Sequence, residues 1–408
     1  MNKEWKSSKV KYIFSIINGS TPSSFIENYW DGNIVWVTPE DINLKEKYIF
    51  NSKKKITEEG YKNCGTTIIP KDSLVLTTRA PVGNIAISGL PLCTNQGCKS
   101  LVLKDKAVIN YFYYKLLSMN KELNSISSGS TFIELSTDKL SSLTIPLPPL
   151  QTQKTIANFL DKETARIDKL IQSKEKLISL LEEKKQSMIS QVVTRGLDPK
   201  VKLKDSGIPW IGKIPKHWEV EKARWLFTQS HIQVSDNDEI VTCFRNGRVT
   251  LRKNVREEGF TNAIKELGYQ GIQKGQLVLH SMDAFAGAIG VSDSNGKCSP
   301  EYIICDPIKK SILNDYYAFI IRKMALNGFI QASCPAVRER APRIRFSNFK
   351  DMLLPLPPRK EQKEIVEYLK KFITQTNNII SKTQESIELL KERRTAIISE
   401  AVTGKLKL

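Results

Sequence analysis

Apolar positions follow two different patterns along this chain of 408 residues. Short runs rich in β-branched and apolar residues predict strands, and they end at turn residues such as Pro39. In the first 144 residues the predicted strands cover 33–38, 73–78, 84–88 and 99–103, and a helix is predicted near 110–117. Strands and helices in this irregular order favour an α+β fold over regular βαβ alternation.

Two long charged segments, 151–193 and 360–402, carry apolar residues three, four or seven positions apart, which predicts helices. Each would be about 65 Å long at 1.5 Å per residue. A lone polar helix of this length cannot cover its apolar stripe, so we expect the two helices to pack together as an antiparallel coiled coil. The alternative is that each helix packs only on its own globular segment. The predicted contact residues are Ile156, Leu160, Ile167, Leu170, Leu177, Leu181 and Met188 on the first helix, and Ile365, Leu369, Ile373, Ile380, Ile387 and Leu390 on the second.

The chain contains one pattern twice, at a constant offset of 209 positions (146 to 355, 194 to 403). A proline block precedes each long helix, IPLPP at 145–149 and LPLPP at 354–358. A period this long indicates duplicated domains, not a solenoid. We therefore expect a globular domain over 1–144, a Pro block with its helix over 145–197, a linker over 198–216, a second globular domain over 217–353, and a second Pro block and helix over 354–408.

Net charge changes the picture, because 62 Lys and Arg outnumber 43 Asp and Glu to give +19. A chain this basic favours a polyanionic partner, most often nucleic acid, over the alternative of a generally basic proteome. Apolar runs are too short to cross a bilayer, and the first residues lack a secretory pattern. Seven cysteines without a Cys-x-x-Cys pair, and three scattered histidines, argue against disulfides and zinc. These features indicate a cytoplasmic protein that does not act at a membrane.

Catalytic patterns are missing from the sequence. No Asn-Pro-Pro-aromatic tetrapeptide or Gly-x-Gly nucleotide loop occurs, and the run from Gly207 to Lys213 fails as a phosphate loop because Ile214 replaces the required Ser or Thr. We therefore expect a chain without catalytic activity, cofactor or metal of its own.

Basic and amide side chains form the positive chemical signal. The arginine fork suits guanine, since it bonds O6 and N7 together, and Asn or Gln can pair with adenine in the same bidentate way. Each such residue has the alternative of contacting phosphate or solvent. The candidate DNA-binding residues are Lys53, Lys54, Lys55, Arg79, Asn95 and Gln96 in the first domain, and Arg245, Arg248, Arg252, Arg338, Arg340 and Arg343 in the second.

Two motifs now point to a family. The pattern Pro-Leu-Pro-Pro-x-x-x-Gln occurs at 146–153 and again at 355–362, each time before a long helix. After the first helix comes DSGI-x-WIG-x-IP-x-x-W at 205–218. Together they make the whole chain resemble the specificity subunit of type I restriction-modification systems of bacteria and archaea. The resemblance implies two α+β target recognition domains separated by two long helices in an antiparallel coiled coil.

The resemblance also implies a function. Each recognition domain would read one half of a bipartite, asymmetric site in double-stranded DNA, and the coiled coil would set the unread spacer. The subunit would hold two modification subunits, which methylate adenine with S-adenosylmethionine, and recruit restriction subunits, which use ATP and Mg²⁺ to translocate and cut. The alternatives are a scaffold that does not bind DNA, a stand-alone enzyme, or the DNA-binding part of another methyltransferase or nuclease assembly.

Overall fold

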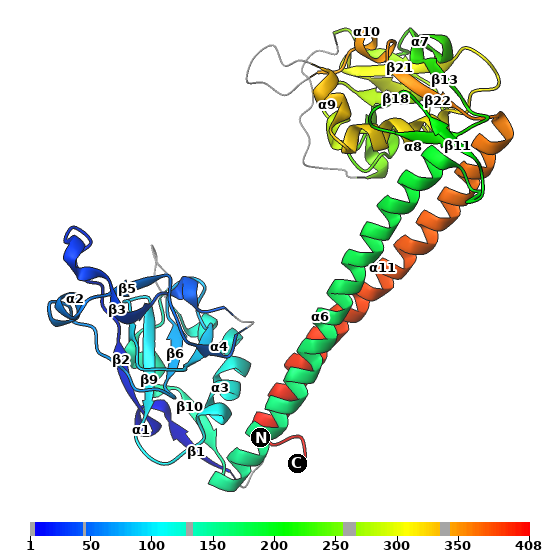
Figure 1. Cartoon of the computed structure of the whole chain (residues 1–408). Helices are drawn as coiled ribbons and strands as arrows, with labels where there is room; N and C mark the ends of the chain where they lie inside the picture. Colours follow the sequence, from blue (N-terminus) through cyan, green and yellow to red (C-terminus); the bar gives the residue numbers. More distant parts are fainter. Residues whose placement is uncertain (1–4, 44–45, 128–133, 256–266, 335–342) are drawn as a thin grey trace. The chain divides into compact units, whose positions relative to one another are not determined.

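The computed structural model describes residues 5–43, 46–127, 134–255, 267–334 and 343–408, and the chain divides into two compact units (Figure 1). The first unit comprises residues 1–175 and 384–408, and the second comprises 176–383. Helices α6 (Leu150–Arg195) and α11 (Arg359–Val402) each contribute to both units, so each unit combines one globular domain with parts of both helices.

The first globular domain contains ten strands and five short helices among its described residues. The strands are β1 (Lys6–Lys9), β2 (Phe14–Asn18), β3 (Trp30–Val37), β4 (Tyr48–Ile49), β5 (Lys54–Ile56), β6 (Leu74–Thr77), β7 (Ile85–Ser88), β8 (Cys93–Thr94), β9 (Cys98–Leu103) and β10 (Thr144–Leu147). The helices are α1 (Val10–Ile13), α2 (Glu58–Lys62), α3 (Ile109–Ser118), α4 (Asn120–Ile126) and α5 (Thr137–Ser142), with 3₁₀ turns η1 (Glu27–Tyr29) and η2 (Pro39–Asp41). Five strands form a sheet in the order β2-β9-β6-β7-β4, beside a β5-β3-β8 sheet and a β1-β10 pair.

Strands β6 and β7 of the five-stranded sheet are buried on both faces. Leu74 and Leu76 of β6 join the core that includes α3, whereas Val75 between them packs toward the second sheet with Val35 and Val37. Alternate residues of a strand point to opposite faces, so a strand covered on both sides must be apolar throughout. This explains the uninterrupted apolar run, and the predicted strands and helix of this domain are confirmed.

The second globular domain repeats this plan. Its strands are β11 (Leu203–Asp205), β12 (Lys213–Pro215), β13 (Glu219–Lys222), β14 (Phe227–Gln229), β15 (Val241–Cys243), β16 (Val249–Leu251), β17 (Gln270–Ile272), β18 (Leu277–His280), β19 (Ile289–Val291), β20 (Gly296–Cys298), β21 (Tyr302–Pro307) and β22 (Leu353–Leu356). Its helices are α7 (Ala223–Leu226), α8 (Asn314–Leu326), α9 (Phe329–Ser333) and α10 (Phe346–Phe349), with 3₁₀ turns η3 (Arg252–Asn254) and η4 (Ala284–Ala286). The main sheet has the order β14-β21-β18-β19, which matches β2-β9-β6-β7. Leu277 and Leu279 face α8, and Val278 faces the opposite core, as in the first domain.

The two long helices run antiparallel within each unit. In the first unit the guanidinium of Arg394 donates two hydrogen bonds to Asp168, at 2.9 and 3.2 Å. In the second unit Lys185 donates to Asn377 at 3.1 Å. The start of α6 therefore lies beside the end of α11, and the end of α6 beside the start of α11 (Figure 1).

Six positions of each helix dock on the globular domains, and the same six are used twice. Ile156, Ala157 and Leu160 of α6 enter the core of the first domain, together with Ile398, Ala401 and Val402 of α11. The residues 209 positions away fill the equivalent places in the second domain, namely Ile365, Val366 and Leu369 of α11 with Ile189, Val192 and Val193 of α6. Each domain is thus held by the start of the helix that follows it and by the end of the other helix.

The seam of the helix pair departs from the predicted stripe at two positions. Leu170 and Leu177 are 43% and 44% exposed, whereas their neighbours Ile171 and Ile178 are half-buried. Two packed helices cover only a narrow seam, so a position 100° away on the helix turns toward solvent. Of the other predicted contacts, Ile156, Leu160, Ile167, Ile365, Leu369 and Ile387 are buried, and Leu181, Met188, Ile373, Ile380 and Leu390 are half-buried.

Part of the segment predicted as a linker packs on the second domain. Ile208, Ile214 and Trp218 are buried, and the Trp218 indole donates to Glu361 at 2.9 Å. The other carboxylate oxygen of Glu361, Oε1, accepts a hydrogen bond from His217 Nε2 at 2.7 Å. The described part of the chain contains no helix long and apolar enough to span a bilayer.

Candidate nucleic-acid interface

One edge of the first domain gathers several of the predicted residues. Strand β3 ends, β5 begins and β8 ends at this edge, because β3 pairs antiparallel with β5 and parallel with β8. The turn 95–97 follows β8 directly, and its Gly97 carbonyl accepts from Thr78 at 2.8 Å. Lys53 and Lys54, the turn with Asn95 and Gln96, and the β6–β7 loop that carries Arg79 therefore lie along one rim.

The amide side chains of this rim have local partners. The side-chain oxygen of Asn95, Oδ1, accepts from the Gly97 backbone amide at 3.0 Å, which stabilises the turn. Gln96 contacts the Thr21 hydroxyl. Asn95 thus shapes the rim, and Gln96 lies at its surface.

The three lysines differ in their surroundings. Lys53 pairs with Glu40 at 3.0 Å, and its ammonium is well exposed. Lys54 lies over the Trp30 ring, 5.4 Å from the ring centroid. Lys55 is half-buried on the opposite face of β5, since neighbouring strand residues alternate. Lys53 and Lys54 are thus placed to meet a phosphate backbone, and Lys55 less so.

Arg79 belongs to a small charged network. Its Nε donates to Glu134 Oε2 at 3.1 Å, and Glu134 Oε1 lies 3.6 Å from Lys99 Nζ. The Lys99 side chain is only 6% exposed, whereas the Arg79 side chain is 45% exposed. A buried ammonium requires a paired charge, so Lys99 fixes the carboxylate that in turn fixes Arg79.

The second domain has the same backbone frame at this place. Thr78 donates to Gly97 and accepts from Leu135, at 2.8 and 2.9 Å. Ser281 correspondingly donates to Glu301 and accepts from Ile344, at 2.7 and 3.0 Å. Beside this frame, Arg343 Nη1 donates to Glu301 Oε1 at 3.1 Å.

The arginines near β15 and β16 face different surroundings. Arg245 Nη2 donates to Asp283 Oδ1 at 2.9 Å, in the β18–β19 loop and thus near the same rim. Arg248 lines a cavity of about 750 Å³ between this domain and the helices of its own unit. Arg252 Nε donates to Thr242 at 3.3 Å and so turns back onto β15. Arg338 and Arg340 lie outside the described residues.

Half-buried Arg322 ties the two loops of this rim together. It donates from Nε to the Gly287 carbonyl and from Nη2 to the Arg245 carbonyl, both at 3.0 Å. Burial lowers the pKa of the Arg322 guanidinium, yet two carbonyl acceptors satisfy its charge. His280, at the start of the loop, accepts at Nδ1 from the amides of Met282 and Asp283.

Sequence reasoning missed the acids Glu134 and Glu301 and the supports Lys99 and Arg322. A search for cationic and amide side chains overlooks carboxylates, although an arginine that reads a base is often held by one. The offset of 209 positions, which joins Glu134 to Arg343, was the available signal.

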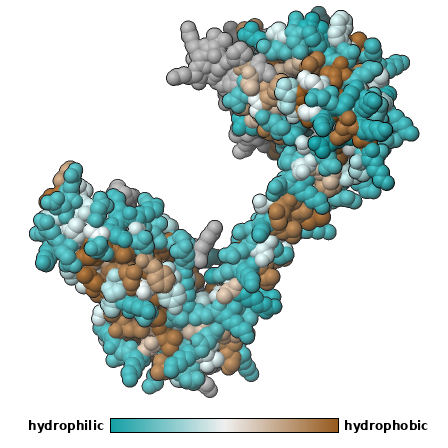
Figure 2. Space-filling view, viewed as in Figure 1, coloured by the Kyte–Doolittle hydropathy of each residue, from teal (hydrophilic) through white to brown (hydrophobic). Residues whose placement is uncertain are grey.

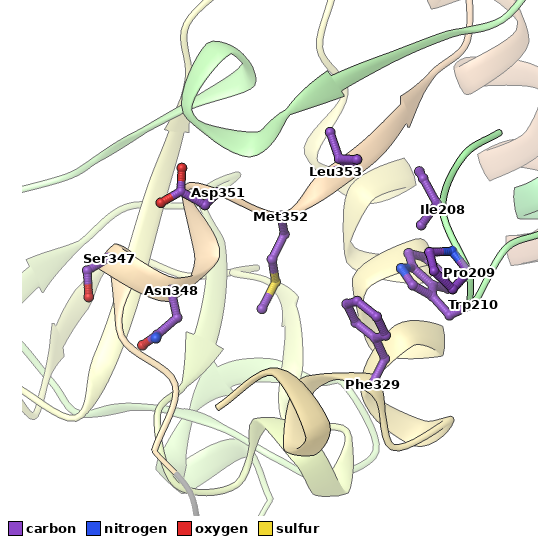
Figure 3. A pocket seen from close by; sticks show the side chains of 9 residues that line it. All are labelled: Ile208, Pro209, Trp210, Phe329, Ser347, Asn348, Asp351, Met352 and Leu353. Carbon is purple, nitrogen blue, oxygen red and sulfur yellow. The ribbon is translucent and has the colours of Figure 1, made fainter. Parts of the chain in front are cut away.

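A second hollow of the second unit is apolar (Figure 3). It encloses about 430 Å³ and is lined mainly by Ile208, Trp210, Phe329, Met352 and Leu353. Its Asp351 is paired with Arg224. Because it offers few free donors, it is a poor match for a phosphate or a base edge. The described residues contain no group of three or more His, Cys, Asp or Glu that could hold a metal.

Hydrophilic residues cover most of the visible surface of both units, and apolar residues appear in scattered patches (Figure 2). The candidate rim described above carries partly exposed arginines, lysines and amides. This composition is expected of a surface that meets DNA.

Comparison with known proteins gives consistent results. The family described as "Type I restriction modification DNA specificity domain" matches residues 2–182 and 229–389. The type I restriction enzyme MjaIX specificity subunit of Methanocaldococcus jannaschii is 42% identical over 183 residues, which are 44% of this chain and 41% of that protein. This chain therefore spans about two fifths of the length of that relative. The MjaVIII specificity subunit of the same organism is 23% identical over 100% of this chain and 94% of its own length.

Two solved structures share the fold. A chain from a study of complex assembly and conformational transition of the type I R-M system has a TM-score of 0.74 at 15% identity, covering 100% of this chain and 99% of its own. The HsdS subunit from Thermoanaerobacter tengcongensis has a TM-score of 0.58 at 16% identity, covering 100% and 98%. The predicted fold class, two α+β domains with two long helices packed together, is confirmed. With its duplicated domains, its helix pair and a family match over most of its length, this chain belongs to the DNA specificity subunits of type I restriction-modification systems, which are non-catalytic and carry no cofactor.

Proposed function

We propose that each globular domain of this chain reads one half of a bipartite, asymmetric DNA site. The observation that carries this proposal is a contrast within each domain: the backbone frame is the same in both domains, but the charged side chains on the rim differ. The six helix positions that hold each domain recur at one offset, and the backbone bonds around Thr78 have counterparts around Ser281. The charged side chains on that frame differ, since Glu134 stands where the second domain has Arg343. Equal frames with different side chains suit two different half-sites.

We also propose that the length of the helix pair sets the unread spacer. Helix α6 has 46 residues and α11 has 44, and both run without interruption. An α-helix of 46 residues is about 69 Å long at 1.5 Å per residue. That length is on the order of two turns of B-DNA, each about 34–36 Å, which is the scale on which paired recognition elements meet half-sites.

The partners follow from the family. We propose that two modification subunits bind this chain and methylate adenine with S-adenosylmethionine, and that restriction subunits add ATP- and Mg²⁺-dependent cleavage. Exposed apolar residues on the long helices support two equivalent contacts with modification subunits. Leu170 and Leu180 of α6 occupy positions equivalent to Ile379 and Leu389 of α11, at the offset of 209 positions. Large apolar side chains exposed at matching places suit a partner present in two copies.

Methylated-base sequencing of cells that produce this chain with its modification subunit tests the proposal. One bipartite motif containing methyladenine is expected. Exchange of residues 220–350 for the second domain of another family member should change one half of the motif and leave the other half and the spacer intact. A change in both halves, or in neither, would contradict the assignment of one domain to each half-site.

A further inference from the structure

On the backbone frame that both domains share, the rim of each domain contains an arginine whose guanidinium is held by a carboxylate and still has a complete pair of donors free. We propose that Arg79 and Arg343 each read a guanine, one in each half-site, and that Glu134 and Glu301 are the positioning residues that aim them. This inference rests on the proposed function and deepens it. It assigns base reading to two particular side chains and predicts a G·C pair in both half-sites.

The atoms that are engaged decide which edge of each guanidinium stays free. A guanidinium can grip guanine O6 and N7 through Nη1 with Nη2, or through Nε with Nη2. Arg79 uses Nε for Glu134, which leaves the Nη1–Nη2 edge. Arg343 uses Nη1 for Glu301, which leaves the Nε–Nη2 edge. Among the described residues, neither guanidinium has another hydrogen-bond partner.

Arg245 also pairs with a carboxylate and is more exposed. Its contact to Asp283 engages Nη2. Because Nη2 carries two hydrogens, one donor pair of Arg245 stays complete, and free donors alone do not separate it from Arg343. Arg343 is preferred because its partner Glu301 belongs to the backbone frame that both domains share, whereas Asp283 lies in the β18–β19 loop.

Fixation of the side chain matters because a mobile arginine loses rotamer entropy when it binds. Glu134 is held from behind by buried Lys99, and the backbone of Glu301, directly before β21, is fixed by its bond with Ser281. The side chains of Arg79 and Arg343 remain 45% and 54% exposed, so both can still reach a groove. Each arginine is thus oriented before DNA arrives.

The order of charges along the chain is inverted between the two domains. In the first domain the arginine comes from the β6–β7 loop and the acid from the residue before Leu135. In the second domain the residue before Ile344 is the arginine, and the acid precedes β21. The two guanidinium groups therefore approach from different segments of one frame, which gives the two half-sites different positions for their guanine.

The test uses the full chain produced with its modification subunit, and it compares methylation at the cognate motif with methylation at every single-base variant. Arg79→Lys keeps the charge and removes the fork. It should lower discrimination at one G·C pair of one half-site by about 5- to 150-fold, the equivalent of 1–3 kcal/mol. Glu134→Gln should relax the same base pair only, and Arg343→Lys should relax one pair of the other half. In each variant the unaltered half-site reports that the chain is folded.

Arg166→Lys is the matched control, because Arg166 also pairs with a glutamate, at 3.4 Å, but on the exposed surface of α6. It should leave both half-sites unchanged. A wild-type motif that lacks a G·C pair in either half would overturn the inference, as would unchanged discrimination in Arg79→Lys or Arg343→Lys. Relaxation by Arg245→Lys in place of Arg343→Lys would also overturn it. If the wild-type complex methylated no bipartite motif, the proposed function itself would fail.

Discussion

The buried glutamine of each Pro-Leu-Pro-Pro-x-x-x-Gln motif offers a sharp test of how the frame is stabilised. Gln362 is fully buried, and its side-chain oxygen accepts from the Leu313 amide at 2.9 Å. Its amide donates to the carbonyls of Pro357 and Ser311, at 2.9 and 3.2 Å. One side chain thus joins the Pro block, the start of α11 and the first turn of α8.

Replacing Gln362 with Leu keeps a similar volume and removes all three bonds. The Leu313 amide and the Pro357 carbonyl then lack a partner inside the domain, whereas the Ser311 carbonyl comes from an exposed residue and can be hydrated. Each buried group left unsatisfied costs about 1–3 kcal/mol, or roughly 2–6 kcal/mol for the two. The additional apolar burial of leucine offsets about 1 kcal/mol. We expect the second unit to lose about 1–5 kcal/mol of its free energy of unfolding.

Hydrogen exchange with peptide resolution is the appropriate assay, because it reports the opening free energy of each segment separately in a protein of two units. Amides of α8 should exchange faster in Gln362→Leu, and amides of α3 should not. Gln153→Leu should give the opposite pattern, since Gln153 bonds Val108 and Pro148 in the first unit. The matched control is Lys363→Ala, an exposed neighbour on the same helix. A loss below about 1 kcal/mol at α8, or an equal effect on α3, would refute the reasoning.

Three further predictions concern the helix pair, a half-buried histidine and a close backbone contact. A double-mutant cycle of Arg394→Met and Asp168→Asn, measured by urea unfolding, should give a coupling of about 1 kcal/mol, since the pair is bidentate but only partly buried; additive effects would count against it. Burial lowers the pKa of His280, so the unfolded chain takes up the proton first, and stability is lost as pH falls below about 6.5. His280→Asn should flatten that decline in thermal unfolding between pH 7 and 5, and an unchanged slope would exclude His280 as its source. A Cβ at Gly19 would lie 1.9 Å from the Asn95 carbonyl oxygen, whereas one at Gly65 would meet nothing closer than 3.6 Å, so Gly19→Ala should lower the melting temperature by several degrees and Gly65→Ala should not.

The burial pattern of the strands and long helices was predictable because it depends on local periodicity. Leu74, Val75 and Leu76 form a continuous apolar run whose counterpart is Leu277 to Leu279, and both runs are central strands. The helix seam was predicted less well. Thr164 and Thr383 are buried there, and their hydroxyls donate to carbonyls one turn earlier, so a search for apolar residues overlooks them.

The candidate interface was predictable in residue type but not in arrangement. Arg79 and Arg343 were found because arginine suits guanine, yet nothing in the sequence separates them from Arg245 or Arg248. The separation depends on which arginine pairs with an acid on the backbone frame that both domains share, and on Arg248 lining the cavity beside the helices. Contacts of this kind join residues far apart in the chain, such as Lys99 with Glu134, and local spacing carries no record of them.

The sequence by itself determined the duplication, the two long helices, the α+β character of each domain and the family, because all of these depend on repeated motifs and on the period of apolar residues. Only the tertiary structure decided that each domain is held by the ends of both helices, and that the charged pair on the common frame is inverted between Arg79–Glu134 and Glu301–Arg343. The physical reason is that a helix or strand is specified by residues a few positions apart, whereas the orientation of a guanidinium is specified by whichever loops the fold brings beside it.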